Sequence, residues 1–215
     1  MGTRRDLTGA ERIECLRKGR PNMISTEGNF PMAMQNGYIS GKWTIGNWYK
    51  KANDYKGSFP HDVLERLLIM YPDCINRSLH LFSGTLKDDP DRVITWDIKP
   101  EILVNSTTGE KVKPTICDDI RNIKKQKYRD MIRSRRLIIC DRPYNGHHVD
   151  YGTPKFDHRQ VIRDLEEIMM PGQYLAWLDN IKPMYRRDDL QVVADIDVTI
   201  STECNIRKWM VWRRR

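Results

Sequence analysis

Three short apolar runs in this sequence each end at a polar residue that could contact a ligand. The runs at 79–82, 92–96 and 136–140 have the composition of buried parallel strands, and they are followed by Ser83, Asp97 and Asp141. In an open α/β sheet, ligands bind in the crevice beyond the carboxyl ends of the strands. Asp97 could therefore accept hydrogen bonds from a ribose diol, although many α/β proteins end a strand at an aspartate that binds nothing.

The elements around these runs indicate how they are positioned. Strands alternate with helices, and the apolar spacing between 157 and 170 predicts a helix with Asp157 as its N-cap. A strand at 174–178 follows, and the runs at 191–200 and 205–212 predict an antiparallel pair. The fold class is therefore α/β, with a Rossmann-like sheet that is mostly parallel and carries a C-terminal antiparallel strand pair.

The N-terminal part has a different composition. We expect residues 1–57 to form an irregular extension, rich in aromatic residues and glycine, before an α/β domain at 58–215. A capping box formed by Thr8 and Glu11 predicts a short helix over about 9–18. The aromatic residues of the extension are interleaved with lysines, so they could stack on unpaired bases, although packing against the core is the commoner outcome.

A tetrapeptide, Asp141-Arg142-Pro143-Tyr144, directly follows one of the apolar runs. Four other segments accompany it in a fixed order: Leu-His-Leu-Phe-Ser-Gly at 79–84, Thr-Trp-Asp-Ile at 95–98, Asp-Asp-Ile-Arg-Asn at 118–122 and Met-Pro-Gly-Gln-Tyr-Leu-Ala-Trp-Leu at 170–178. Together they resemble the class I S-adenosylmethionine-dependent methyltransferases. More narrowly, they resemble the amino-methyltransferases of DNA, whose hallmark at this strand end is Asp/Asn-Pro-Pro-Tyr/Phe. The resemblance covers roughly residues 58–212 and implies a class I methyltransferase sheet in a catalytic domain.

The resemblance also implies S-adenosylmethionine as the cofactor. Phe82, Ser83 and Gly84 would approach its methionine part, and Asp97 would bind its ribose hydroxyls. The other cofactor-binding residues that it implies are Ile98 next to Asp97, Asp119 or Asp118 near the adenine, and Phe59 with Pro60 flanking the methionine part.

In the same family, the strand-end carboxylate and the carbonyl after it accept hydrogen bonds from the amino group of the target base, and the tyrosine stacks on that base. The catalytic residues implied here are Asp141, Arg142, Pro143 and Tyr144. An exocyclic amine is a poor nucleophile because its lone pair is delocalised, and two acceptors can hold it toward a methyl donor. A base inside a duplex cannot reach such a site, so it would be flipped out or taken from a single strand.

Two departures from the family pattern bear on these assignments. Arg142 stands where the relatives have their first proline, so it would either crowd the pocket or hold a phosphate beside the flipped nucleotide. Only twelve residues separate Gly84 from Asp97, which leaves an abbreviated crossover where a parallel pair usually has a helix. Both departures keep open the alternative of a protein that binds nucleic acid without catalysis.

Charge is concentrated in one block of the chain. The net charge is +8, and residues 121–136 hold eight basic side chains against the single acid Asp130. This block could contact phosphates, or it could be a solvated helix face. The nucleic-acid-binding residues that it predicts are Lys124, Lys125, Lys127, Arg129, Arg133, Arg135 and Arg136. A second basic cluster, at 207–208 and 213–215, has the same two interpretations.

Other features argue against several classes of protein. No stretch has the roughly 18 apolar residues of a membrane span, and the first residues lack the apolar middle of a secretory signal. The five cysteines are odd in number and widely spaced, which predicts a reducing, cytoplasmic compartment and no zinc site. His147 and His148 follow the tetrapeptide without the cysteine or carboxylate spacing of a metal site, so no metal is predicted.

We therefore expect a cytoplasmic amino-methyltransferase of DNA, with adenine favoured over cytosine as the target base. Its partner would be nucleic acid, DNA more than RNA, and recognition would fall to the region 19–60 and the loop at 145–157, in a homodimer or with a partner subunit. Two alternatives stay open: a methyltransferase-like binding subunit that has lost catalysis, and an RNA methyltransferase.

Overall fold

The computed structural model describes most of the chain after residue 65 and two short stretches before it. The described residues are 23–25, 32–45, 66–67, 70–74, 76–84, 86, 89, 92–99, 103–104, 111–143, 149, 152–180, 183, 189–200 and 206–215. Their strands are β1 (Met23–Ser25), β2 (Met32–Gln35), β3 (Tyr38–Ile45), β4 (Ser78–Leu81), β5 (Val93–Asp97), β6 (Leu103–Val104), β7 (Lys111–Val112), β8 (Ile116–Cys117), β9 (Leu137–Asp141), β10 (Tyr174–Asp179), β11 (Leu190–Ile200) and β12 (Ile206–Arg214). The α-helices α3 (Gln126–Ser134) and α4 (His158–Ile168) and the 3-10 turns η2 (Pro72–Cys74) and η3 (Ile120–Asn122) connect them.

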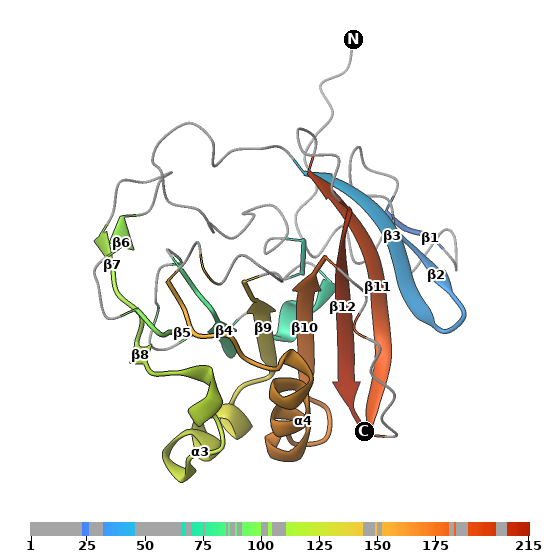
Figure 1. Ribbon diagram of the computed structural model, residues 1–215. Coiled ribbons are helices and arrows are strands. Elements are labelled where there is room, and N and C mark those ends of the chain that lie inside the picture. The colour runs from blue at the N-terminus through green and yellow to red at the C-terminus, as the bar shows by residue number, and fades with distance from the viewer. Residues whose placement is uncertain are drawn as a thin grey trace.

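Ten strands form one sheet in the order β1-β2-β3-β11-β12-β10-β9-β4-β5-β8, and β6 pairs with β7 separately (Figure 1). The half from β10 to β8 is parallel throughout. Its strands, counted along the chain, lie in the order 3-2-1-4-5 of a doubly wound sheet. β12 then runs antiparallel to both β10 and β11. The predicted Rossmann-like sheet with its C-terminal antiparallel pair is therefore confirmed.

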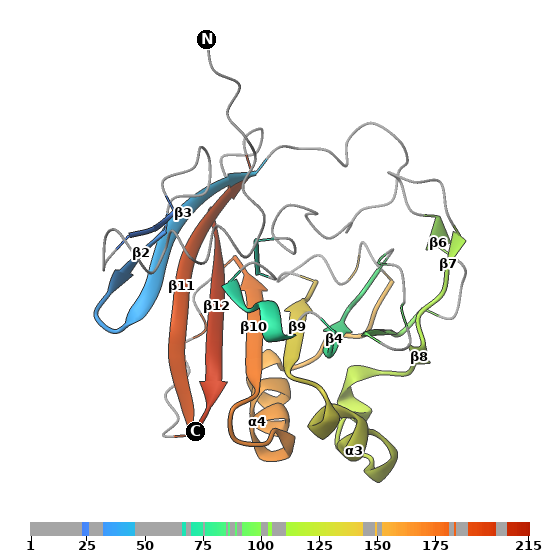
Figure 2. The ribbon, with the colours of Figure 1, turned by 180° about the vertical axis from the view of Figure 1, so that it is seen from behind.

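The central strands are hydrophobic on both faces because both faces are covered. In β9, Ile138 and Cys140 belong to one buried cluster, and Leu137 and Ile139 belong to another. Helices α3 and α4 lie on the first face, in front of the sheet in Figure 1 and behind it in Figure 2. Leu67 and Cys74 pack against the other face. The side chains of a buried strand alternate between two cores, which explains a continuous apolar run rather than an alternating one.

The predicted helix at 157–170 is confirmed with slightly narrower bounds. Asp157 is its N-cap, because the side chain accepts a hydrogen bond from the Arg159 main-chain N–H at 2.9 Å, and α4 begins one residue later. Its apolar face, Val161, Ile162, Leu165 and Ile168, is almost completely buried. The helix expected at 9–18 lies outside the described residues.

The N-terminal extension is more regular than the sequence predicts. Three of its segments are strands, and β3 pairs in parallel with β11, so the sheet continues across the boundary expected at residue 57. Asn36 and Gly37 join β2 to β3 with φ values of 53° and 82°. Two successive positive φ angles at Asn-Gly are typical of a tight hairpin turn. Trp43 of β3 is fully buried, so part of this aromatic region packs on the core.

Candidate cofactor and substrate site

The carboxyl ends of the parallel strands lie along one edge of the sheet. β4 and β9 are parallel neighbours in that edge, with Leu81 opposite Cys140. The chain order reverses between them, because β5 lies beyond β4 and β10 lies beyond β9. Open sheets bind ligands at such a reversal. The turn after Leu81 therefore lies on one side of this reversal. Asp141, which follows Cys140, lies on the other side.

The turn after β4 contains a buried hydroxyl group. Phe82 and Gly84 have positive φ angles of 58° and 53°, which is uncommon for a residue with a side chain such as phenylalanine. Ser83 between them is 2% exposed, and within the described part of the chain its Oγ has no hydrogen-bond partner. An unpaired buried hydroxyl costs roughly 1–3 kcal/mol. This unsatisfied atom is the feature of the turn that best fits a bound polar group.

Asp97 fixes the same turn from the neighbouring strand. Its Oδ2 accepts a hydrogen bond from the Gly84 main-chain N–H at 2.9 Å, and its Oδ1 accepts one from the Lys99 N–H at 3.1 Å. Each carboxylate oxygen has a second lone pair, so both can still accept a further hydrogen bond. Asp97 is half-buried and Ile98 follows it directly after β5, and their contact with a ribose stays a prediction.

Asp118 lies next to Asp97 but is occupied by its own surroundings. Its main-chain N–H donates to the Asp97 carbonyl at 3.2 Å. Its carboxylate accepts hydrogen bonds from Tyr128 Oη at 2.5 Å, Asn122 Nδ2 at 2.7 Å and the Asp119 N–H at 2.8 Å. These bonds, the one from Tyr128 above all, lower the pKa of Asp118 to about 2. The carboxylate thus holds η3 and α3 in place.

Asp119, the other candidate for the adenine contact, is also engaged locally. Its carboxylate accepts from the Arg121 main-chain N–H at 2.9 Å, which caps η3, and binds the Arg121 guanidinium through both oxygens. The hydrogen bonds from Arg121 lower the pKa of Asp119. Neither carboxylate is thus presented as an uncommitted acceptor.

The tetrapeptide after β9 is described as far as Pro143, and Tyr144 lies outside the described residues, together with Phe59, Pro60, His147 and His148. Asp141 is half-buried at the strand end. Arg142 is turned inward: its Nε donates to Asp179 Oδ2 at 2.8 Å, and its Nη1 donates to the Pro143 carbonyl at 3.0 Å. Arg142 therefore neither crowds an open pocket nor offers its charge to a phosphate, because its guanidinium is committed to an internal ion pair.

Two residues of this region were not predicted from the sequence. Asp179 ends β10 as Asp97 and Asp141 end their strands, so the same strand-end pattern would have found it. Phe156 stacks on the Phe82 ring, with centroids 5.0 Å apart and an interplanar angle of 17°. An apolar residue directly before a helix N-cap is a signal for packing at the start of that helix, but nothing in the sequence pointed to Phe82 as the partner. His158, the first residue of α4, lies near Arg142 and Asp179. Burial and the charge of Arg142 lower the pKa of His158.

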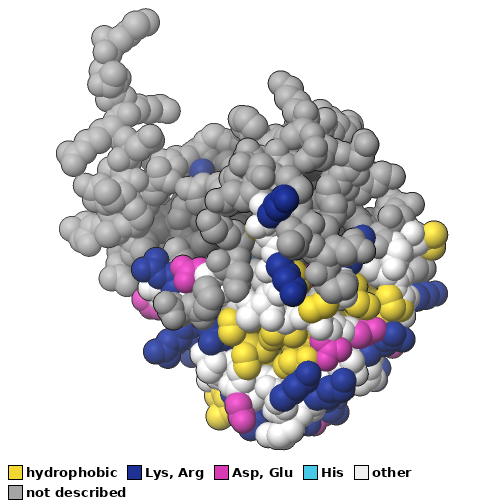
Figure 3. Space-filling model, turned by 90° about the vertical axis from the view of Figure 1, so that its left-hand side faces the viewer, with side chains coloured by type: hydrophobic (Ala, Val, Ile, Leu, Met, Phe, Trp, Pro, Cys, Tyr) yellow, Lys and Arg dark blue, Asp and Glu magenta, His cyan; other side chains and the backbone are white. Residues whose placement is uncertain are grey.

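The basic block forms η3, α3 and the approach to β9, and acids bind much of it. Lys124 binds Glu167 at 2.6 Å and Arg129 binds the same carboxylate at 3.2 Å, both across to α4. Lys125 and Lys127 each lie 3.7 Å from Asp118, and Arg121 binds Asp119. Figure 3 shows this side of the molecule, where Lys and Arg side chains lie around a hydrophobic area and are interspersed with acids. The remaining predicted nucleic-acid-binding residues are Arg133, Arg135 and Arg136, at the end of α3 and the start of β9.

Among the residues that the structure describes, no group of three or more His, Cys, Asp or Glu side chains is arranged to hold a metal ion. No helix in the same part of the chain has the length and apolar character needed to cross a bilayer.

Comparison with known proteins gives weak likenesses. No family model matches the sequence, and no curated protein matches it. Among solved structures, a Streptococcus mutans protein assigned to the SAM-dependent methyltransferases is 10% identical, with a TM-score of 0.47, over 87% of this chain and 56% of that one. A mutant form of MtNAS is 11% identical, with a TM-score of 0.42, over 72% of this chain and 60% of that one. This chain thus spans less than two thirds of either protein, and the chemistry of the site has to be inferred from its own residues.

Proposed function

We propose that this protein is an S-adenosylmethionine-dependent methyltransferase that acts on the exocyclic amino group of a base in DNA, with adenine favoured over cytosine. The observation that carries the proposal is the shared position of two segments. The turn at 82–84 and Asp141 flank the chain reversal between β4 and β9, so a donor at the turn and an acceptor group at Asp141 would meet there.

The cofactor fits this edge in two respects. The Ser83 hydroxyl is a buried polar atom that still lacks a partner, and Asp97 retains acceptor capacity on both oxygens. When bound, S-adenosylmethionine would supply a methyl group activated on sulfonium. The odd number and wide spacing of the five cysteines are the basis for proposing a reducing compartment, the cytoplasm.

Asp141 and the carbonyl after it would orient the amine. Their two acceptors bind the amine hydrogens and keep its lone pair directed at the methyl donor, so catalysis depends on positioning and electrostatics. Pro143 fixes the chain direction beyond them, and Tyr144 is the proposed stacking surface for the base. The Arg142–Asp179 pair holds the ends of β9 and β10 together beneath this site. Arg142 is thus a positioning residue in this proposal.

A second candidate function is a binding subunit without catalysis. The observation that favours it is that Asp118 and Asp119, two of the acids expected at the cofactor, already bind the protein's own groups. Loss of affinity for the adenosine part would leave a methyltransferase-like scaffold.

One assay separates these functions. The protein is incubated with methyl-labelled S-adenosylmethionine and either duplex DNA, single-stranded DNA or RNA, beside D141A and the matched control D130A, an exposed carboxylate on α3. We expect label in adenine of DNA, a loss of at least 100-fold in D141A and no change in D130A. Circular dichroism melting checks that D141A is folded.

Two other outcomes of this assay would change the proposed substrate or the proposed activity. Label in RNA alone would replace DNA by RNA as the substrate. No label in any polymer, with no heat on titration of S-adenosylmethionine and with DNA binding intact, would overturn the proposal and leave the binding subunit.

A further inference from the structure

Seven arginines gather at the amino-terminal edge of the sheet, opposite the edge that carries the candidate site. Arg92, Arg77 and Arg136 immediately precede β5, β4 and β9. The antiparallel strand β12 ends at the same edge with Arg213 and Arg214, and Arg215 follows them. Arg135 completes the set, which we call the arginine row. The row joins the end of the basic block at 121–136 to the basic cluster at 213–215.

Main-chain hydrogen bonds link the row from strand to strand. The Ser78 N–H donates to the Arg92 carbonyl at 2.9 Å, and the Arg136 N–H donates to the Arg77 carbonyl at 2.7 Å. The Tyr174 N–H donates to the Arg136 carbonyl at 2.9 Å, and Tyr174 faces Arg213 across β10 and β12. Four strand-to-strand steps of about 4.8 Å give the row a length of about 19 Å. The spacing is fixed by the sheet and not by flexible loops.

The row has little compensating charge. Arg77, Arg92, Arg136, Arg213 and Arg215 are exposed, and among the described residues no carboxylate pairs with any of them. Three acids lie nearby, Asp73, Asp89 and Asp189, and Asp189 is bound by Arg214 at 2.9 Å. Within the row, Arg135 and Arg214 each have a buried Nε without a hydrogen-bond partner among the described groups. Burial and the charge of Arg77 lower the pKa of Arg135, as expected where like charges lie close together.

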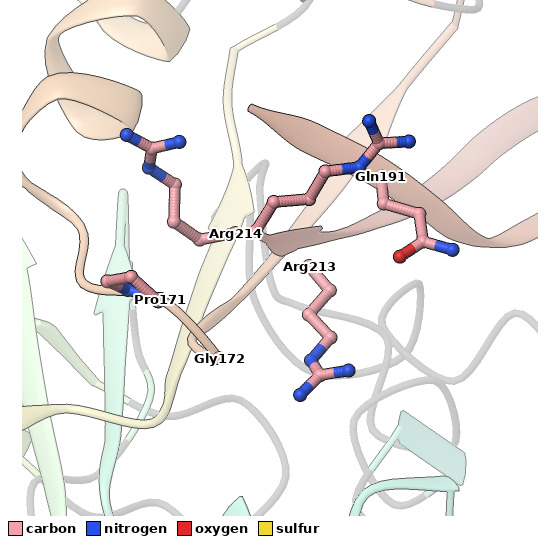
Figure 4. A pocket seen from close by; sticks show the side chains of 6 residues that line it. Pro171, Gly172, Gln191, Arg213 and Arg214 are labelled. Atoms are coloured by element: carbon pink, nitrogen blue, oxygen red, sulfur yellow. The ribbon is translucent and has the colours of Figure 1, made fainter. Parts of the chain in front are cut away.

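A hollow lies at one end of the row. Its volume is about 370 Å³, and it is lined by Pro171, Gly172, Gln191, Arg213, Arg214 and Arg215. Figure 4 shows Arg213 and Arg214 leaving the end of β12 in different directions around it. Gly172 closes the adjoining turn with φ of 88°, and its N–H donates to the Arg214 carbonyl at 2.8 Å. The volume of the hollow lies in the range of ligand-binding pockets, and the arginines that line it suit an anion.

We propose that the arginine row is a nucleic-acid-binding surface that contacts the phosphate backbone and is separate from the candidate catalytic edge. Guanidinium groups bind phosphate in a bidentate manner, and a row of about 19 Å matches about five base steps along a duplex rather than one free phosphate. The lysines of the basic block are weaker candidates, because Asp118 and Glu167 bind them. The row requires neither the cofactor nor Asp141, so this inference does not rest on the proposed function.

The test compares two variants that lose the same charge. One is R77Q/R136Q/R213Q, which removes three exposed row arginines, and the other is K124Q/K125Q/K127Q, which removes three lysines that acids bind. Binding of fluorescent duplex and single-stranded DNA is measured by anisotropy from 50 to 300 mM salt without cofactor. For the row variant we expect at least a tenfold loss of affinity and a decrease of about 2 to 3 in the slope of log affinity against log salt. The control variant should lose less than threefold.

Several results would overturn the inference. Equal losses in the two variants would show that only total charge matters, and a larger loss in the lysine variant would place the contact on α3. Displacement of all DNA by inorganic phosphate at constant ionic strength would identify a small-anion site. Thermal melting checks that each variant is folded. Unchanged DNA binding in the row variant would contradict the arginine row alone, even with methyl transfer intact, whereas loss of transfer in D141A has no bearing on the row.

Discussion

Arg142 and Asp179 form a buried ion pair between the ends of β9 and β10, with Nη2 and Oδ2 2.6 Å apart and side chains 5% and 3% exposed. Asp179 Oδ2 also accepts from Trp177 Nε1 at 3.3 Å, and Oδ1 accepts from the Asn180 N–H at 2.7 Å. The guanidinium of Arg142 is thus fully paired within the protein. The charge of Arg142 thus compensates the buried charge of Asp179.

Removing one partner of this pair should destabilise the protein strongly. We expect R142A to lower the free energy of unfolding by about 3–5 kcal/mol, because it leaves the Asp179 charge buried and uncompensated. R142M/D179L, which removes both charges, should recover a large part of that loss. Urea denaturation followed by tryptophan fluorescence measures both. R163A, which breaks the exposed pair with Asp157, is the control and should cost less than 1 kcal/mol.

The Ser83 hydroxyl should be dispensable for stability. S83A removes a buried polar atom that has no partner in the described residues, so the melting temperature should stay the same or rise. If S-adenosylmethionine binds at this turn, S83A should weaken its affinity by about three- to tenfold, measured by isothermal titration calorimetry. S134A, in an exposed hydroxyl at the end of α3, is the control. A clear loss of stability in S83A would contradict the absence of a partner.

Asp118 should make stability depend on pH in the acid range. Its folded pKa of about 2 lies below the usual value of 3.8, so its contribution is complete above pH 4 and is lost as the pH falls toward 2. Y128F removes the main cause of this shift, so the carboxyl should titrate at higher pH and the free energy of unfolding at pH 7 should fall by about 2 kcal/mol. Carboxyl NMR titration and urea denaturation test this. An unchanged Asp118 titration in Y128F would contradict it.

His80 should add a second pH dependence. It is buried within β4, and burial lowers its pKa from 6.5 to about 4, so the folded state favours the neutral ring. The unfolded chain takes up the proton first, and stability should fall as the pH decreases from 6.5 to 4, by at most about 1.4 kcal/mol per pH unit. H80Q should flatten this part of the curve of unfolding free energy against pH. Identical slopes for wild type and H80Q between pH 6.5 and 4 would show that another group is responsible.

The parallel half of the sheet could be predicted because its signals are local. Each strand is a short apolar run. Asp157 and the apolar spacing after it predict both ends of α4 to within one helical turn. The edge shared by Ser83, Asp97 and Asp141 followed from the geometry of parallel strands alone. The N-terminal strands were missed, although the Asn36-Gly37 dipeptide is a strong hairpin signal. The surrounding aromatic residues lack an alternating pattern and obscured it.

The sequence does not predict which charged side chains are paired with one another inside the protein. Lys124 binds Glu167, which lies 43 residues further along the chain, and Arg142 binds Asp179, which lies 37 residues further. Such pairs depend on the packing of α3 against α4 and of β9 against β10, which no local pattern specifies. For the same reason, the two basic clusters that are separate in the sequence meet at one edge only once the strands are placed.

The pairing of β3 with β11 can form only late in the synthesis of the chain. Ile39 lies opposite Ala194, about 150 residues apart along the chain, so β3 leaves the ribosome long before its partner exists. Until then its hydrogen-bonding edge and Trp43 are uncovered, and contacts of such long range form slowly. We expect this side of the sheet to close last, and the nascent protein to need protection from aggregation until translation reaches residue 200.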